Sequence, residues 1–202
     1  MIGFDLIAWP PPPPSQLGSM RWAKKVLGPE EWVQFQQHPH PKWYVAQCWA
    51  AKEAQFKLLC HLGWQQGFKP KSLPLSNLPL KLAWQEVAGR LNPQWHDLGT
   101  LPPPHSLRPG FLMALASLAE VEWHELVVHV EYQSGMSAVS RSQKLTEQLI
   151  TFVSRQTQKP TQDWRLKKQA NGLPRLLLKG EYYPLAFSLS HDGPWLGMVI
   201  NY

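Results

Sequence analysis

The sequence contains few of the features that mark secreted or membrane-spanning proteins. Cys48 and Cys60 are its only cysteines among 202 residues. Both fall in one predicted helix, roughly 18 Å apart, which is too far for a disulfide, so we expect reduced thiols in the core. No apolar run approaches the ~20 residues of a membrane span, and no basic segment precedes an apolar one as in a signal peptide. We therefore expect a cytoplasmic protein without a membrane partner.

Runs of like charge are also missing, although the formal net charge is +6. A basic chain favours an anionic partner such as a nucleotide or an acidic protein. The eleven tryptophans are scattered through the chain and match no nucleic-acid-binding module, so we expect no nucleic-acid partner. A hydrophobic content of 44% in a chain of this length predicts a globular protein with a sizeable core.

An Ala-rich stretch at 43–61 predicts a buried helix and carries the main candidate site. At 100° per residue, Glu53 and Lys57 share one stripe between two apolar sectors, whereas Lys52 and Gln55 mark the predicted solvent side. An exposed Glu/Lys pair of little energetic value is the alternative interpretation, but it fits this arrangement poorly. Two charges in a partly dry site favour an anionic ligand with its cation.

The N-terminal residues 1–8 predict a strand with one charge, Asp5. Ile2, Phe4, Leu6 and Ala8 are expected on the face opposite to Asp5. An isolated carboxylate in an apolar strand requires a hydrogen-bond donor or a metal ion, and a structural hydrogen bond is the simpler alternative.

The rest of the pattern predicts an α+β fold. Helices are expected at 19–27, 30–37 and 142–156, and strands at 78–87, 124–132, 163–168, 175–178, 183–190 and 195–202. Residues 90–108 are expected to be irregular, and residues 134–140 to form a linker. A two-residue turn at Asn171-Gly172 predicts a hairpin between two of the strands.

Three other motifs receive plain interpretations. The prolines at 10–14 predict a polyproline II linker, with an SH3-type ligand as the alternative. His38 and His40 lack a third metal ligand nearby in sequence. His124 and His129 are five residues apart in a strand-like run, which excludes the helical zinc-protease motif.

Four motifs together resemble the 4′-phosphopantetheinyl transferase superfamily. Residues 49–57 read W-x-x-K-E-A-x-x-K, and Gly3-Phe4-Asp5 resembles the G-(I/V)-D element that precedes it. Residues 171–174 and 188–193 resemble the G-K-P and S-x-S-H-x-G elements. A Ser-His pair at a strand end beside a glycine turn can offer hydroxyl, imidazole and backbone N–H groups to a phosphate.

The resemblance implies transfer of 4′-phosphopantetheine from coenzyme A to a serine of an acyl or peptidyl carrier protein. It implies that Asp5 and Glu53 bind Mg²⁺ and, with Lys57, form the catalytic group. Lys57, Ser190 and His191 would contact phosphate.

Arg141 falls where the long, surfactin-synthetase-activating type places an arginine that binds the 3′-phosphate of coenzyme A. An exposed surface arginine is the alternative interpretation.

The order of the motifs is reversed relative to that long type, which consists of two fused, similar halves. We interpret the chain as a circular permutation with pseudo-twofold halves at 1–133 and 137–202, which is tolerated when the original termini lie at the surface. A permuted long form completes its site as a monomer. The rival is a relative of the short, trimeric holo-acyl-carrier-protein synthases, which have the same motif order.

Some positions depart from the family pattern. Ile7 stands where the long type often has a second acidic metal ligand, and Leu173 replaces the basic residue of G-K-P. The prolines at 10–14 occupy a stretch that approaches the carrier protein in the family. A catalytically inactive relative that binds coenzyme A or a carrier domain is therefore the alternative function.

Overall fold

The computed structural model describes most of the chain. The described residues are 1–9, 19–64, 67–75, 79–85, 89–91, 93–104, 110–118, 126–169 and 172–201. The predicted polyproline segment at 10–14, His124 and Asn171 of the predicted turn lie outside the described residues.

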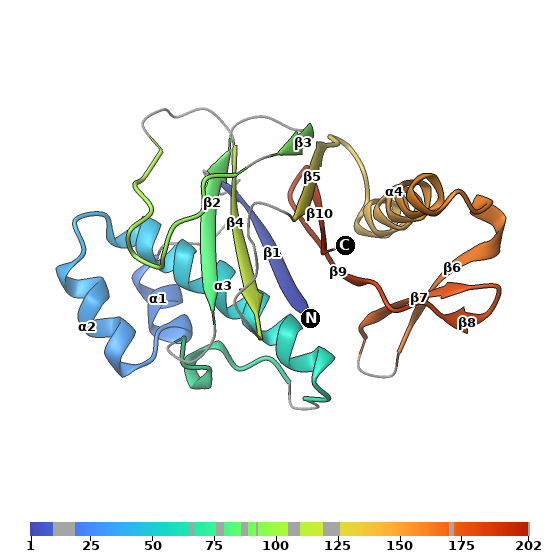
Figure 1. Cartoon of the computed structure of the whole chain (residues 1–202). Helices are drawn as coiled ribbons and strands as arrows, with labels where there is room; N and C mark the ends of the chain where they lie inside the picture. The colour runs from blue at the N-terminus through green and yellow to red at the C-terminus, as the bar shows by residue number, and fades with distance from the viewer. Residues whose placement is uncertain are drawn as a thin grey trace.

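The first layer is a helix on an antiparallel sheet, and it carries the predicted N-terminal strand. The sheet has the order β1 (Ile2–Trp9), β4 (Gly110–Ser117), β2 (Leu80–Gln85). Helix α3 (Pro41–His61) lies across this sheet (Figure 1). Its alanines at 46, 50 and 54 face the sheet, and their small side chains allow a close approach.

A second antiparallel sheet joins distant parts of the chain. Its order is β3 (Gly89–Leu91), β5 (Val127–Tyr132), β10 (Trp195–Asn201), β9 (Ala186–Asp192). Helix α4 (Ala138–Thr157) packs against β10, β9 and the small sheet β6 (Trp164–Lys168), β7 (Pro174–Leu178), β8 (Glu181–Tyr182). The predicted hairpin between β6 and β7 is thus confirmed, and the fold is α+β.

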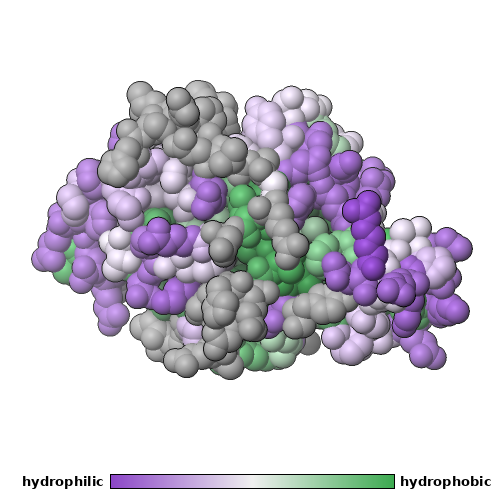
Figure 2. Space-filling model, turned by 45° about the horizontal axis from the view of Figure 1, so that its top comes forward, coloured by the Kyte–Doolittle hydropathy of each residue, from purple (hydrophilic) through white to green (hydrophobic). Residues whose placement is uncertain are grey.

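The two larger sheets meet at β1, which packs against β9 and β10. One face of β1 contributes the predicted side chains at 2, 4, 6 and 8 to a core shared with Val128, Val130 and Trp195. Hydrophobic residues also gather near the middle of the face shown in Figure 2, between hydrophilic ends. β1 is therefore the central element that both parts of the protein share.

The prediction that Lys52 and Gln55 lie on the solvent side of α3 was wrong. Lys52 is fully buried and Gln55 is 6% exposed. Helices α1 (Met20–Val26) and α2 (Pro29–Gln37) and the 3₁₀ turn η1 (Pro70–Ser72) contact this side of α3. A helical wheel cannot reveal that a second layer covers the polar stripe.

Two smaller predictions also need correction. The stretch 90–108 was expected to be irregular, but its first residues belong to β3. The expected linker at 134–140 ends early, because Ser137 caps α4 by accepting a hydrogen bond from the backbone N–H of Ser140. A second 3₁₀ turn, η2 (Thr161–Asp163), follows α4.

Among the helices in the described ranges, none combines the length and the apolar content that crossing a membrane requires.

Candidate functional site

The site begins where β1 lies directly against α3. A Cβ atom at Gly3 would come 2.0 Å from the backbone oxygen of Ala54, so only glycine permits this separation. Two residues further along β1, Oδ1 of Asp5 lies 2.8 Å from Nζ of Lys57. Lys57 also donates a hydrogen bond of 2.9 Å to the backbone oxygen of Phe4. The close approach of strand and helix therefore brings the predicted Asp5 and Lys57 into contact.

Glu53 lies one helical turn before Lys57, and the charge of the Asp5 carboxylate affects its pKa. Burial and, next, the nearby Asp5 raise the pKa of Glu53 to about 7, although Lys57 opposes this shift. No described residue donates a hydrogen bond to Glu53. The site thus contains a partly buried carboxyl group whose pKa is raised toward neutral pH.

Strand β9 supplies the next partners of β1. The hydroxyl of Ser190 donates a hydrogen bond of 2.8 Å to Oδ1 of Asp5. Ser188 Oγ accepts a hydrogen bond from the backbone N–H of Phe4 at 3.0 Å, and Asp192 Oδ2 accepts one from Ala8 at 2.8 Å. Side chains of β9 thus form hydrogen bonds to β1, and one of these bonds joins the two predicted site residues Ser190 and Asp5.

Asp192 adds a third carboxyl group near this point. Burial is the main cause that raises its pKa, and the charge of Asp5 acts in the same direction. The sequence analysis did not single out Asp192, because it occupies the variable position of the S-x-S-H-x-G motif. Only its alignment beside β1 reveals that it faces the same acidic cluster.

His191 lies at the border between this cluster and α4. Its Nε2 atom is 3.4 Å from the hydroxyl of Ser142. Burial lowers the pKa of His191, and the positive charges of Arg141 and Lys57 lower it further. A bound anion would have the opposite effect on this imidazole.

Arg141 is in the neighbourhood of His191, but its guanidinium group is engaged locally. One terminal nitrogen donates a hydrogen bond of 2.8 Å to the backbone oxygen of Met136. Its Nε atom is buried and has no hydrogen-bond partner among the described residues. The structure therefore brings Arg141 to the rim of the site and does not place it in the cavity lining.

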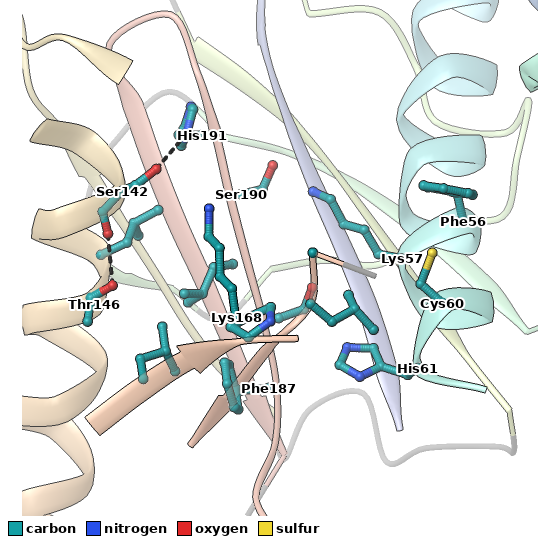
Figure 3. A pocket seen from close by; sticks show the side chains of 17 residues that line it. Phe56, Lys57, Cys60, His61, Ser142, Thr146, Lys168, Phe187, Ser190 and His191 are labelled. Atoms are coloured by element: carbon teal, nitrogen blue, oxygen red, sulfur yellow. Dashed lines mark hydrogen bonds between the residues drawn. The ribbon is translucent and has the colours of Figure 1, made fainter. Parts of the chain in front are cut away.

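A cavity of about 320 Å³ opens beside these residues, between α3, α4, β9 and the β6–β7 hairpin. Figure 3 shows Lys57 and Phe56 on one side, Ser142 and Thr146 on another, and Lys168 extending from β6. No acidic residue is among the described residues that line it. Its volume is that of a small-molecule site, and its charge suits an anionic ligand with an apolar portion.

Asp5 and Glu53 offer carboxylate oxygens, the ligand type that a divalent cation prefers. No described residue hydrogen-bonds to Oδ2 of Asp5 or to Glu53, so these oxygens remain available. Mg²⁺ is typically held by one or two carboxylates together with substrate phosphates and water. In the described part of the chain, no three His, Cys, Asp or Glu residues are grouped to hold a metal alone.

The raised pKa of Glu53 predicts a pH-dependent stability. The folded protein holds the Glu53 proton more tightly than the unfolded chain, whose pKa is about 4.5, so the free energy of unfolding falls between about pH 4.5 and pH 7. We expect this group to contribute a loss of about 3 kcal/mol over that window. Glu53→Gln should lack this loss when chemical denaturation is measured at pH 4.5 and pH 8. Parallel pH profiles of the two proteins would contradict the assignment.

The structure therefore gathers most of the predicted residues and adds several unpredicted ones. Asp5, Lys57 and Ser190 are in direct contact, Glu53 interacts electrostatically with Asp5, and His191 lines the adjoining cavity. The unpredicted members are Ser142, Lys168, Ser188 and Asp192. Lys168 could have been suspected from the alternation of residues 164–168, but nothing local in the sequence reveals which sheet face meets α4.

Comparison with known proteins supports the resemblance over part of the chain. Residues 1–96 match the family model of the 4′-phosphopantetheinyl transferase superfamily. This segment contains Asp5, Glu53 and Lys57, whereas Ser190, His191 and Arg141 lie beyond it. Neither the curated proteins nor the solved structures provide a match to the chain.

Proposed function

We propose that the protein transfers 4′-phosphopantetheine from coenzyme A to a serine of an acyl or peptidyl carrier protein, with Mg²⁺. The observation that carries this proposal is the contact of Asp5 with Lys57 and Ser190, beside Glu53 and at the edge of a cavity whose described lining contains no acidic residue. Carboxylates suit a hard cation, and the neighbouring basic cavity suits the phosphates that this cation would share. The family match over residues 1–96 supports the same activity.

In this proposal, each residue of the site has a distinct role. Asp5 and Glu53 hold Mg²⁺, which, when bound, neutralises charge on the pyrophosphate of coenzyme A. Lys57 and His191 bind phosphate oxygens, and Ser190 orients Asp5 through its hydrogen bond.

The proposed reaction is a displacement at phosphorus. The serine oxygen of the carrier protein forms a bond to the β-phosphorus, the bond from that phosphorus to the bridging oxygen breaks, and 3′,5′-ADP leaves. The serine proton passes to Glu53.

We also propose that the chain is a permuted long-type enzyme that acts as a monomer with parts 1–133 and 137–202. This is supported by a cavity whose walls come from α3 in the first part and from α4, β6 and β9 in the second, all within one chain. A short-type enzyme would complete its site between subunits. A molar mass in solution of one chain or of three distinguishes the two.

The activity is tested by incubating an apo carrier protein with coenzyme A, Mg²⁺ and this protein, and by weighing the product in a mass spectrometer. One added phosphopantetheine is expected. Glu53→Gln should lower the rate by about 100-fold or more, because a base and a metal ligand are lost together. The matched control is Glu147→Gln, which neutralises an exposed carboxylate on α4 and should leave the rate unchanged.

Two outcomes would contradict the proposal. Equal rates for the Glu53 and Glu147 variants would remove Glu53 from the chemistry. Binding of coenzyme A without any mass gain, across fatty-acid, polyketide and peptide carrier proteins, would instead favour the non-catalytic binding protein.

A further inference from the structure

Lys168 is a cation that points into the cavity (Figure 3). It extends from the end of β6 into the space between α3 and α4 (Figure 3). Among the described residues, none forms an ion pair or a hydrogen bond with the ammonium group of Lys168. By contrast, Lys57 is bound to Asp5, and Arg141 donates to the backbone of Met136. Of the two lysines in the described lining, Lys168 is therefore the one whose ammonium group has no counterion.

The register of the hairpin explains why Lys168 faces inward. Side chains alternate along a strand, so Lys168 shares a face with Leu166 and Trp164. Leu166 also lines the cavity, and Trp164 is fully buried. Lys167 pairs with Arg175 on the opposite face. Both lysines are exposed, but of the two only Lys168 lines the cavity. Two adjacent lysines therefore have different surroundings.

The position of Lys168 also places it beside Leu173. Lys168 pairs with Pro174 across the hairpin, and both Leu173 and Pro174 line the same cavity. Leu173 is apolar and cannot neutralise an anion. The ammonium group of Lys168 thus supplies positive charge to a part of the cavity wall that is otherwise apolar.

We propose that Lys168 binds the 3′-phosphate of coenzyme A, and that it does so instead of Arg141. This inference rests on the proposed function. The pyrophosphate is accounted for by Lys57, His191 and the cation held by Asp5 and Glu53. The 3′-phosphate is a separate group with up to two negative charges at neutral pH, and a cation at the open side of the cavity can pair with it through charge-assisted hydrogen bonds. Lys168 is the unpaired lysine in the described lining.

The test compares two ligands that differ only in this phosphate. Isothermal titration calorimetry measures the binding of coenzyme A and of dephospho-coenzyme A to the full chain, without a carrier protein. We expect the wild type to bind coenzyme A about tenfold more tightly than dephospho-coenzyme A, equivalent to about 1.4 kcal/mol. Lys168→Gln should weaken coenzyme A binding by about that factor, leave dephospho-coenzyme A binding unchanged and so abolish the preference.

Lys167→Gln is the matched control, because it removes the same charge from the face of the same strand that does not line the cavity. It should keep the wild-type preference. An equal loss in both variants, or an equal weakening of both ligands by Lys168→Gln, would overturn the assignment to the 3′-phosphate. A wild type that binds neither ligand would overturn the proposed function as well. A wild type with the expected preference but no transfer activity would overturn only that function.

Discussion

Replacing Gly3 with alanine is expected to destabilise the folded protein by at least about 3 kcal/mol. The new Cβ atom would lie 2.0 Å from the backbone oxygen of Ala54 and 2.6 Å from the backbone nitrogen of Leu58. Both contacts are with the backbone of α3, so no side-chain rotation relieves them. Chemical denaturation, with the midpoint and slope fitted separately, measures the loss.

The control for this variant is Gly67→Ala. A Cβ atom at Gly67 meets no atom of the described residues within 4 Å, so the free energy of unfolding should change by less than about 0.5 kcal/mol. A Gly3→Ala protein as stable as this control would mean that β1 and α3 can separate at little cost. In that case the alignment of Asp5 with Lys57 would not depend on their close packing.

Replacing Glu31 with glutamine is expected to destabilise the protein by about 3–5 kcal/mol. Lys52 is fully buried, and its Nζ atom lies 2.7 Å from Oε2 of Glu31 and 2.7 Å from the backbone oxygen of Pro70. The ammonium group thus links α3 to both α2 and η1. Removing the Glu31 charge leaves it buried without a counterion, a loss that thermal and chemical unfolding both measure.

A double replacement distinguishes the cost of an unpaired charge from the value of the pair. Lys52→Met combined with Glu31→Leu removes both charges and should recover much of the stability lost in Glu31→Gln. The exposed pair of Lys81 and Asp97 has an N–O distance of 2.8 Å, close to the 2.7 Å of the buried pair, and serves as the control. Lys81→Met should cost less than about 1 kcal/mol. Similar losses at the two pairs would show that burial of Lys52 is unimportant.

The sequence predicted the structure best where the hydrophobic periodicity of a single strand or helix determines which side chains are buried. Alternation gave the faces of β1, and the Ala-rich pattern gave α3 with Glu53 and Lys57 on one stripe. The helical periodicity of α3 wrongly predicted that Lys52 faces solvent. The partners that bury it, Glu31 and the backbone of Pro70, come from separate elements. A pattern within one helix cannot report an ion pair supplied by another.

The sequence predicted which residues belong to the candidate site better than it predicted the contacts among them. The motifs identified Asp5, Lys57 and Ser190, but the sequence could not show that one oxygen of Asp5 accepts hydrogen bonds from both others. Lys168 was missed because alternation along residues 164–168 puts it on one face of a strand with Trp164 and Leu166 but does not show what that face contacts. Its orientation depends on how the hairpin docks onto α4, which is a long-range property of the fold.

The hydrogen bonds between β1 and β9 have a consequence for how the protein is made. Asp5 and Ser190, which share one hydrogen bond, are separated by 185 positions in the chain. Contacts of such long sequence separation slow folding, since a large loop must close before they form. On the ribosome, the first strand emerges long before its partner exists. The hydrogen bond between Asp5 and Ser190 can therefore form only after β9 has been synthesised, near the end of translation.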